Sequence, residues 1–163
     1  MTAALTEFRI TNDDDLVAFN QTFGGASSSE VIAGVARKFH GRIAVVSSFG
    51  TESAVLLDLV ARVDRDLPVI FLDTGWIFPE TLAYRDALID RLGLTNVSSV
   101  TPDLDGLENE DPSGRLWSTD GDRCCYLRKV APLARALEGV DAWITGRKRF
   151  QTDSRAALPL FEI

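Results

Sequence analysis

The sequence has very few of the residues on which metal sites and disulfide frameworks depend. Its 163 residues include two cysteines, adjacent at Cys124 and Cys125, and a single histidine, His40. Neighbouring cysteines rarely bond to each other because the resulting geometry is strained. The two thiols are therefore free, or metal ligands, or partners for a group outside the chain.

Long apolar runs are missing as well. No stretch approaches the roughly 20 residues that a membrane-spanning helix needs, and residues 1–10 have no apolar signal-peptide core. The net charge of −7 argues against a general nucleic-acid-binding surface. These absences predict a cytoplasmic protein that binds neither membrane nor nucleic acid.

Short apolar runs alternate along the chain with segments of helical periodicity. This alternation predicts an α/β fold, a mainly parallel twisted sheet with helices on both faces, within a single domain over residues 1–163. Residues 101–119 are polar and aperiodic, with Asp111 among five acidic residues, and are expected to form a mobile loop with or without a short helical turn. Residues 157–163 are expected to form another strand or extended segment. The strands are expected at 43–46, 69–72, 96–100 and 142–145, and the helices at 12–23, 27–39, 52–63, 78–92 and 122–137.

The segment 43–53 has the pattern of an anion site. An apolar strand is followed by a small, polar turn with Ser47 and Ser48, and Glu52 and Ser53 then open a helix. Free N–H groups in the first turn of a helix, together with its dipole, favour a negatively charged ligand. No lysine follows Gly50, so this is not the GxxxxGK(S/T) phosphate loop. An ordinary strand-to-helix turn is the alternative interpretation.

Two further turns follow predicted strands, where ligands bind in parallel sheets. Asp73 in the turn 73–75 suggests a metal or ribose ligand, or equally a helix cap. The segment 146–155 carries four cations in ten residues, which favours a phosphate or sulfate site over a solvated loop. These cations are Arg147, Lys148, Arg149 and Arg155.

The cysteine pair is followed, one helical turn later, by Arg128 and Lys129. Nearby cations favour the thiolate, which is the form that ligates metal, but the thiols could also pack as small apolar groups beside solvated cations. Two thiols alone cannot complete a four-cysteine site. The tryptophans Trp76, Trp117 and Trp143 are interpreted as packing residues.

Four blocks together resemble the adenylyl-sulfate and phosphoadenylyl-sulfate reductase family. The resemblance covers residues 43–155 and implies an adenine-nucleotide α-hydrolase-like fold related to the ATP pyrophosphatases. The blocks, in family order, are SSFGTES at 47–53; LDTG at 72–75 with FPET at 78–81; CC at 124–125 with RKV at 128–130 and PL at 132–133; and WITGR at 143–147 with the residues from Gln151 to Arg155.

The resemblance also implies roles for individual residues. The phosphate loop and Arg155 would face the phosphosulfate. The backbone of residues 72–75 and of Gly146 would hold adenosine, and Lys129 would lie near both cluster and substrate. The full set of expected substrate-binding residues is Ser47, Ser48, Phe49, Gly50, Glu52, Ser53, Leu72, Asp73, Thr74, Gly146, Arg147, Arg149 and Arg155.

Within this family, a cysteine pair implies a 4Fe-4S cluster and adenylyl sulfate rather than its 3′-phosphorylated form as substrate. Cys124 and Cys125 would supply two of the four cluster ligands. The family continues with a Cys-x-x-Cys pair and a Glu-Cys-Gly-x-His segment, whose cysteine attacks the sulfate sulfur, forms a thiosulfonate and releases AMP. Thioredoxin or glutaredoxin then frees sulfite. The chain has neither segment.

From this departure we expect a fragment or a truncated product that does not reduce sulfate esters alone. Assembly as a homo-oligomer is left open. Three alternatives stay in view: a phosphoadenylyl-sulfate reductase, an ATP-pyrophosphatase-type protein, and a non-catalytic nucleotide-binding module. The second usually carries Ser-Gly-Gly-x-Asp-Ser, whereas Phe49 and Glu52 stand at the discriminating positions.

Overall fold

The computed structural model describes residues 13–151 and 153–163. They fall into two compact units. One unit comprises Ile32–Gly146; the other includes residues 13–31 and the described part of Arg147–Ile163. Each unit is described by itself.

The larger unit is built on a four-stranded parallel sheet with the order β3-β2-β1-β4. Its central strands are short apolar runs, as expected for strands covered on both faces. Val45, Val69 and Phe71 are each no more than 1% exposed. The strands are β1 (Ile43–Ser47), β2 (Val69–Leu72), β3 (Val97–Val100) and β4 (Ala142–Thr145).

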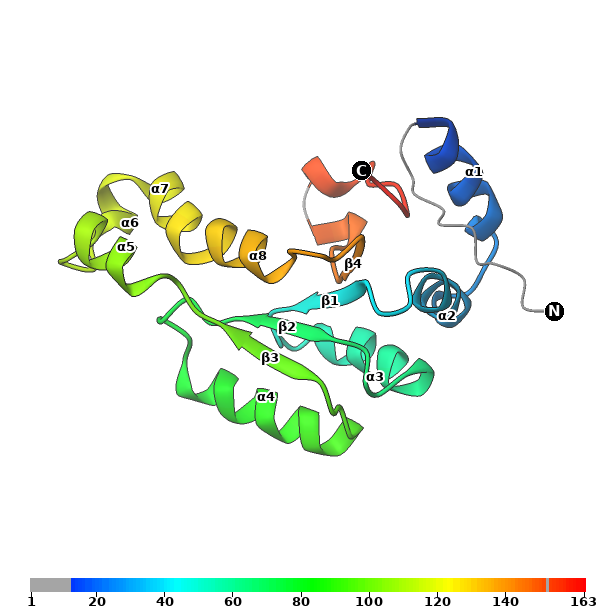
Figure 1. Cartoon of the computed structure of the whole chain (residues 1–163), viewed down its shortest axis with the longest axis horizontal. Coiled ribbons are helices and arrows are strands. Elements are labelled where there is room, and N and C mark those ends of the chain that lie inside the picture. Colours follow the sequence, from blue (N-terminus) through cyan, green and yellow to red (C-terminus); the bar gives the residue numbers. More distant parts are fainter. Residues whose placement is uncertain (1–12, 152) are drawn as a thin grey trace. The chain divides into compact units, whose positions relative to one another are not determined.

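Helices cover both faces of this sheet (Figure 1). The helices α3 and α4 lie on one face, and α8 lies on the other. Leu57 and Val60 of α3 are fully buried, which shows that its apolar side packs into the core. The larger unit contains α3 (Ser53–Val63), α4 (Pro79–Leu92), α5 (Leu104–Glu110), α6 (Leu116–Thr119), α7 (Gly121–Cys125), η1 (Tyr126–Val130) and α8 (Ala131–Ala136).

The strands and long helices thus confirm the predicted α/β architecture. The segment 101–119, expected as a mobile loop with at most a short helical turn, contains two helices, α5 and α6. The Asp103 side chain caps α5 by accepting a hydrogen bond from the Gly106 N–H at 2.8 Å. A short helix needs no long apolar stripe, which is why periodicity did not reveal it.

The expected helix over 122–137 is interrupted by a π-helical turn, η1. Pro132 has no N–H to donate to the carbonyl four residues back. At Ala131 the N–H bonds instead to the Tyr126 carbonyl, five residues back. Such π turns often occur at functional sites.

The smaller unit contains α1 (Asp13–Phe23), η2 (Arg149–Gln151) and η3 (Asp153–Arg155), and α2 (Ser28–Lys38) begins in it. Phe161 packs edge-on against Phe19 with ring centroids 4.5 Å apart. The Asn20 side chain bonds to both the N–H and the carbonyl of Phe161. The described residues 157–163 contain no strand, so of the two alternatives the strand was wrong.

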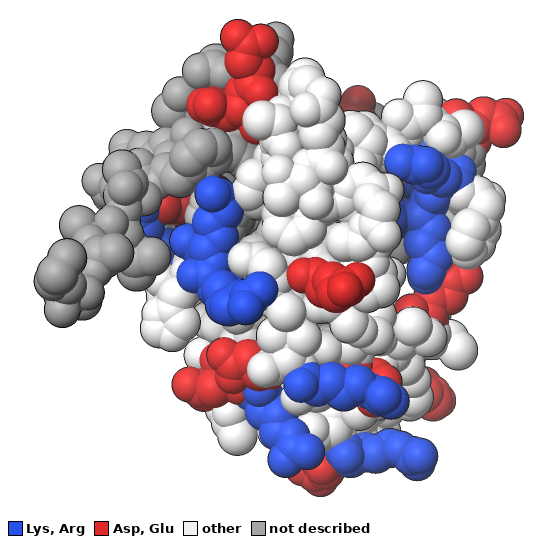
Figure 2. Space-filling view, turned by 90° about the vertical axis from the view of Figure 1, so that its right-hand side faces the viewer, with Lys and Arg blue, Asp and Glu red and all other residues white. Residues whose placement is uncertain are grey.

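On the face shown in Figure 2, basic and acidic side chains are interspersed around a largely uncharged centre. Among the described helices, none is long and apolar enough to cross a membrane.

Candidate functional site

The turns after β1 and β2 and the end of β4 lie at one edge of the sheet. Since all four strands are parallel, the turns that follow β1, β2 and β4 leave from the same side. Ser47 pairs with Phe71, and Val46 pairs with Thr145, so Leu72 and Gly146 lie level with the end of β1. The strand order changes direction between β1 and β4, and such a switch point is where α/β sheets bind ligands.

The loop after β1 is held in a strained conformation. Phe49 has φ of +50°, in the left-handed region that costs most L-residues about 1–2 kcal/mol. Its side chain is fully buried and packs edge-on against Phe71, with centroids 5.6 Å apart. The Phe49 N–H donates to the Ser47 hydroxyl at 3.1 Å. Burial of the ring thus fixes the backbone of the loop.

The backbone of this loop carries hydrogen-bond donors just before the start of α3. The Ser53 N–H bonds to the Gly50 carbonyl, and Glu52, at the N-cap, makes no capping bond from its side chain. Within the described chain, the N–H groups of Gly50 and Thr51 have no backbone partner. Unpaired N–H groups at a helix start, with the helix dipole behind them, are typical of anion sites.

Of the roles that its position suggested, Asp73 does not take that of a helix cap. Its carboxylate accepts a hydrogen bond from the Gly75 N–H at 2.9 Å, and its own N–H donates to the Val100 carbonyl. The N-cap of α4 is Phe78, not Asp73. Asp73 therefore shapes the turn after β2, in which Gly75 has φ of +80°.

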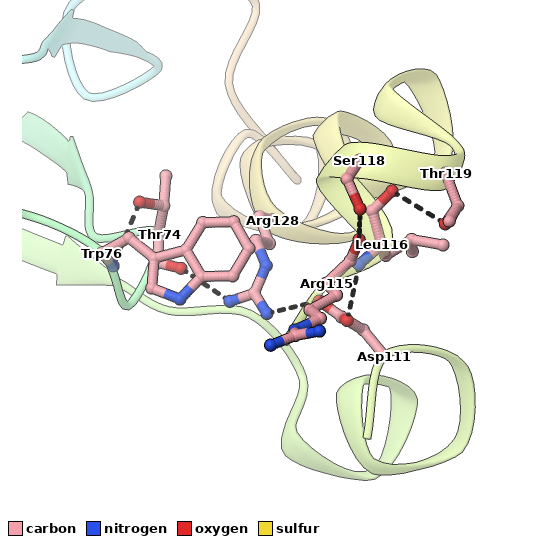
Figure 3. A network of polar contacts seen from close by, with 8 residues as sticks. All are labelled: Thr74, Trp76, Asp111, Arg115, Leu116, Ser118, Thr119 and Arg128. Carbon is pink, nitrogen blue, oxygen red and sulfur yellow. Dashed lines mark hydrogen bonds and ion pairs between the residues drawn. The ribbon is translucent and has the colours of Figure 1, made fainter. Parts of the chain in front are cut away.

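Arg128 joins this turn to the segment that carries the cysteines. Its Nη1 donates to the Thr74 carbonyl at 3.0 Å, and its Nη2 to the Asp111 carboxylate at 2.8 Å. The guanidinium also stacks on the indole of Trp76, 3.6 Å from the ring centroid. Figure 3 shows these three partners around one side chain.

Both members of this ion pair are buried, with 8% of the Arg128 side chain and 1% of the Asp111 side chain exposed. The Arg128 guanidinium, supported by the Leu116 N–H, holds the pKa of the Asp111 carboxyl below its usual value. The Arg128 Nε is buried and has no partner among the described residues. A buried donor left unpaired costs about 1–3 kcal/mol.

The cysteines lie at the end of α7, Cys124 buried and Cys125 exposed. Adjacent residues on a helix do not face the same way, which accounts for the difference. A 4Fe-4S cluster needs four thiolates, whereas the chain has two cysteines. No group of three or more histidine, cysteine or acidic residues suited to a metal ion occurs in the described parts of the chain. The residues of this chain therefore do not by themselves complete a cluster site.

The predicted cations of the loop 146–155 belong to the smaller unit. Arg147 forms an ion pair with Glu162, and the Arg149 Nε donates to the Leu158 carbonyl at 2.7 Å. Arg155 lies in η3, and its carbonyl accepts a bond from the Leu158 N–H. Lys129 belongs to the larger unit, where it is exposed on η1 beside Arg128.

Sequence reasoning missed one residue of this site. It places Asp111 among the acidic residues of a loop, yet Asp111 is buried. Trp76 packs, as expected, against the Arg128 guanidinium, although 47% of it is exposed. Asp111 is 17 residues from Arg128 in the sequence. No local spacing could have indicated that pairing. The proline after the basic pair was the available signal for an irregular helix.

A family model described as the phosphoadenosine phosphosulfate reductase domain matches residues 42–163. The chain belongs to this family. It is 54% identical over 141 residues to the adenosine 5′-phosphosulfate reductase of Mesorhizobium japonicum, covering 86% of the chain and 56% of that protein. It is 39% identical over 154 residues to the phosphoadenosine 5′-phosphosulfate reductase of Alkalilimnicola ehrlichii, covering 91% of the chain and 62% of that protein.

Among solved structures, the phosphoadenylyl-sulfate reductase of Candida auris in a phosphate complex matches with a TM-score of 0.74 at 24% identity. The match covers 96% of the chain and 76% of that protein. It confirms the adenine-nucleotide α-hydrolase-like fold, and the family model and relatives confirm the resemblance to sulfonucleotide reductases. The chain spans less than two thirds of the length of these two bacterial reductases.

Proposed function

We propose that the chain is the adenine-nucleotide-binding domain of a sulfonucleotide reductase of assimilatory sulfate reduction. The whole protein would convert adenylyl sulfate to sulfite and AMP at the expense of reduced thioredoxin or glutaredoxin. The observation that supports this most is the shared edge of the sheet, where a strained loop with unpaired N–H groups adjoins the turn after β2 and the end of β4.

In the proposed reaction, the bond between the sulfate sulfur and the bridging phosphate oxygen breaks. The oxygen leaves with the bonding electron pair as part of AMP, and oxidation of a dithiol to a disulfide supplies the two electrons that reduce sulfate to sulfite. The contribution of this chain is to bind and orient the nucleotide. N–H groups near Gly50 would stabilise the charge on the departing phosphate.

We assign the nucleotide contacts to the two parts of the chain separately. In the larger unit, Ser47, Ser48, Phe49, Gly50, Glu52 and Ser53 would surround the phosphosulfate, and Leu72, Asp73, Thr74 and Gly146 would hold the adenosine. In the smaller unit, Arg147, Arg149 and Arg155 are proposed as further anion-binding residues.

The cysteine segment would contribute in a second way. Cys124 and Cys125 can supply two of the four thiolates of a 4Fe-4S cluster, the other two coming from outside residues 1–163. Lys129 is proposed as a supporting cation, because the neighbouring Arg128 contacts the turn after β2. Anaerobic preparation with iron and sulfide, followed by visible absorbance, tests whether these thiols hold a cluster.

The nucleotide site is tested by calorimetric titration of the polypeptide with adenylyl sulfate, its 3′-phosphorylated form, AMP and ATP with magnesium. We expect adenylyl sulfate and AMP to bind more tightly than the other two. A preference for the 3′-phosphorylated form would make the protein a phosphoadenylyl-sulfate reductase. A preference for ATP with magnesium would favour a pyrophosphatase-type protein, and an absence of binding would contradict the proposed nucleotide site.

Matched serine substitutions locate the site. Ser47→Ala removes the hydroxyl that accepts the Phe49 N–H, and we expect it to weaken adenylyl sulfate binding about fivefold. Ser98→Ala removes an exposed hydroxyl from β3, away from the loops that follow β1 and β4, and should leave binding unchanged. Equal effects of the two substitutions would contradict this placement of the phosphosulfate.

A further inference from the structure

Three segments that are distant in sequence meet at the Arg128 guanidinium (Figure 3). It bonds to the Thr74 carbonyl in the turn after β2 and to Asp111 between α5 and α6, and it belongs to the π turn η1. Among the described residues, no backbone hydrogen bond links these three segments to one another. The turn after β2 is thus tied to the cysteine-bearing helix by this side chain.

Asp111 is itself fixed in place, so it can hold Arg128 in one orientation. One carboxylate oxygen accepts the Leu116 N–H at 2.9 Å, while the other accepts the Arg128 Nη2. The Asp111 N–H donates to the Leu107 carbonyl at the end of α5. These bonds fix the position of the Asp111 carboxylate. Without the carboxylate, Arg128 would lose the acceptor that orients its Nη2.

The turn that Arg128 holds needs external support. Gly75 is in the left-handed region, and a Cβ at this position would lie 3.6 Å from the Arg128 Nη1. Its N–H bonds only to the Asp73 side chain, and the Trp76 N–H reaches the Thr74 hydroxyl at 3.4 Å. These are local bonds within the turn. The bond from Arg128 and its stacking on Trp76 anchor the turn from outside.

The pair is not arranged for stability alone. Arg128 keeps one buried N–H without a partner among the described residues, and it lies in a π turn rather than a regular helix. Buried unpaired donors are uncommon in folded proteins. The contacts of this guanidinium with the Thr74 carbonyl and with Trp76 point to a role in holding the proposed ligand-binding turn.

We propose that Asp111 and Arg128 are positioning residues for the nucleotide site. Through the Thr74 carbonyl and the stacked Trp76, they hold the backbone of residues 72–76 in the conformation that receives the adenosine. The effect on nucleotide affinity rests on the proposed function, whereas the effect on the turn does not. Neither residue is required to touch the nucleotide.

The test compares two neighbouring carboxylates in the full chain. Asp111→Asn retains the shape of the side chain but removes the charge that holds Arg128. Glu110→Gln is the matched control, because Glu110 forms an exposed pair with Arg123 that does not contact the turn. Backbone hydrogen exchange is measured at Gly75 and Trp76, with Val45 and Val60 of the core as references, and AMP affinity is measured by calorimetry.

We expect Asp111→Asn to accelerate exchange at Gly75 and Trp76 about tenfold relative to the core amides, and to weaken AMP binding by a similar factor. Arg128→Lys should behave in the same way, because an ammonium group cannot reproduce the planar fork or the stacking on Trp76. Glu110→Gln should change neither measurement. Asp111→Glu is the second variant if Asp111→Asn fails to fold.

A uniform rise in exchange across turn and core would mean that the pair only stabilises the fold, and the proposal would be wrong. Unchanged exchange at Gly75 and Trp76 would overturn it as well. If the unsubstituted protein binds no nucleotide, the proposed function fails and exchange alone decides on the positioning role. If nucleotide binds but Asp111→Asn leaves its affinity intact, the positioning proposal fails while the proposed function stands.

Discussion

Two ion pairs in the larger unit begin at neighbouring carboxylates and differ mainly in depth. Glu110 pairs with Arg123, and these side chains are 38% and 42% exposed. Asp111 pairs with Arg128, where the exposed fractions are 1% and 8%. In each pair, a carboxylate at the end of α5 meets an arginine from the segment that contains the cysteines.

The comparison shows that two ion pairs with similar pKa shifts can differ in how much the fold depends on them. A hydrogen bond from arginine is the main cause that lowers the pKa of both carboxyls, so titration behaviour alone would make the pairs look alike. Water and salt surround Glu110, whereas Asp111 has exchanged its water for protein partners. Breaking a buried pair leaves an uncompensated charge, and breaking an exposed one leaves a solvated charge.

The largest expected effect comes from removing one member of the buried pair. Arg128→Met should lower the melting temperature by on the order of 5–10 °C, because it leaves the Asp111 carboxylate buried without its counter-charge. Thermal unfolding followed by circular dichroism measures the shift. Arg123→Met, which breaks the exposed pair, is the matched control and should have a much smaller effect.

A double variant sharpens this prediction. When Asp111→Leu accompanies Arg128→Met, no charge is left buried, so part of the lost stability should return. A double variant that is less stable than either single variant would show that the bonds to Thr74 and Leu116, rather than the charge pair, dominate this region.

A smaller effect is expected from the turn that Arg128 supports. Gly75→Ala places a side chain at φ of +80°, which should reduce the free energy of unfolding by about 1 kcal/mol. Gly93→Ala, at φ of +65° at the end of α4, should cost a similar amount. Only Gly75→Ala should also weaken AMP binding. Urea unfolding and calorimetry measure the two effects, and equal loss of AMP affinity in both variants would contradict a local role for the turn.

The sequence predicted the sheet better than it predicted this region. Apolar runs located β1, β2 and β4 because a strand covered on both faces must be apolar over its whole length. The same reasoning treated 101–119 as a loop, where α5 and α6 in fact form. It also left Arg128 as a possible solvated cation, since a buried pair that closes over 17 residues has no periodic pattern.

The same distinction applies to the candidate site: features set by contiguous residues were predictable, and those set by distant contacts were not. The loop 47–53 was predictable because strand, small residues and helix start are contiguous in the chain. The Asp73 turn was not, since a carboxylate that bonds two residues ahead and one that caps a helix look identical in sequence. The left-handed Phe49 was likewise hidden, because its conformation depends on burial against Phe71 from another strand.

Acid titration offers a further way to compare the two carboxylates. A lowered pKa means that the folded protein binds a proton less readily than the unfolded chain at these residues. The stabilisation is therefore complete above the ordinary values of 4.5 for Glu110 and 3.8 for Asp111, and is lost as the pH falls through the lowered values. Urea unfolding between about pH 7 and pH 3 should show Asp111→Asn losing less stability on acidification than the unsubstituted protein. Parallel curves would contradict the contribution of Asp111.

The smallest effect is expected from the exposed pair, and salt should abolish it. Glu110→Gln should change the melting temperature by no more than about 2 °C at low ionic strength. In about 1 M salt, charges are screened over roughly 3 Å, so the difference between Glu110→Gln and the unsubstituted protein should vanish. The loss caused by Asp111→Asn should persist at the same salt concentration, because solvent ions have no access to a carboxylate that is 1% exposed. Thermal scans of the three proteins at both salt concentrations decide the matter. If the effect of Asp111→Asn decreased with salt as much as that of Glu110→Gln, burial would not protect the Asp111–Arg128 pair from screening, and the contrast between the two pairs would be wrong.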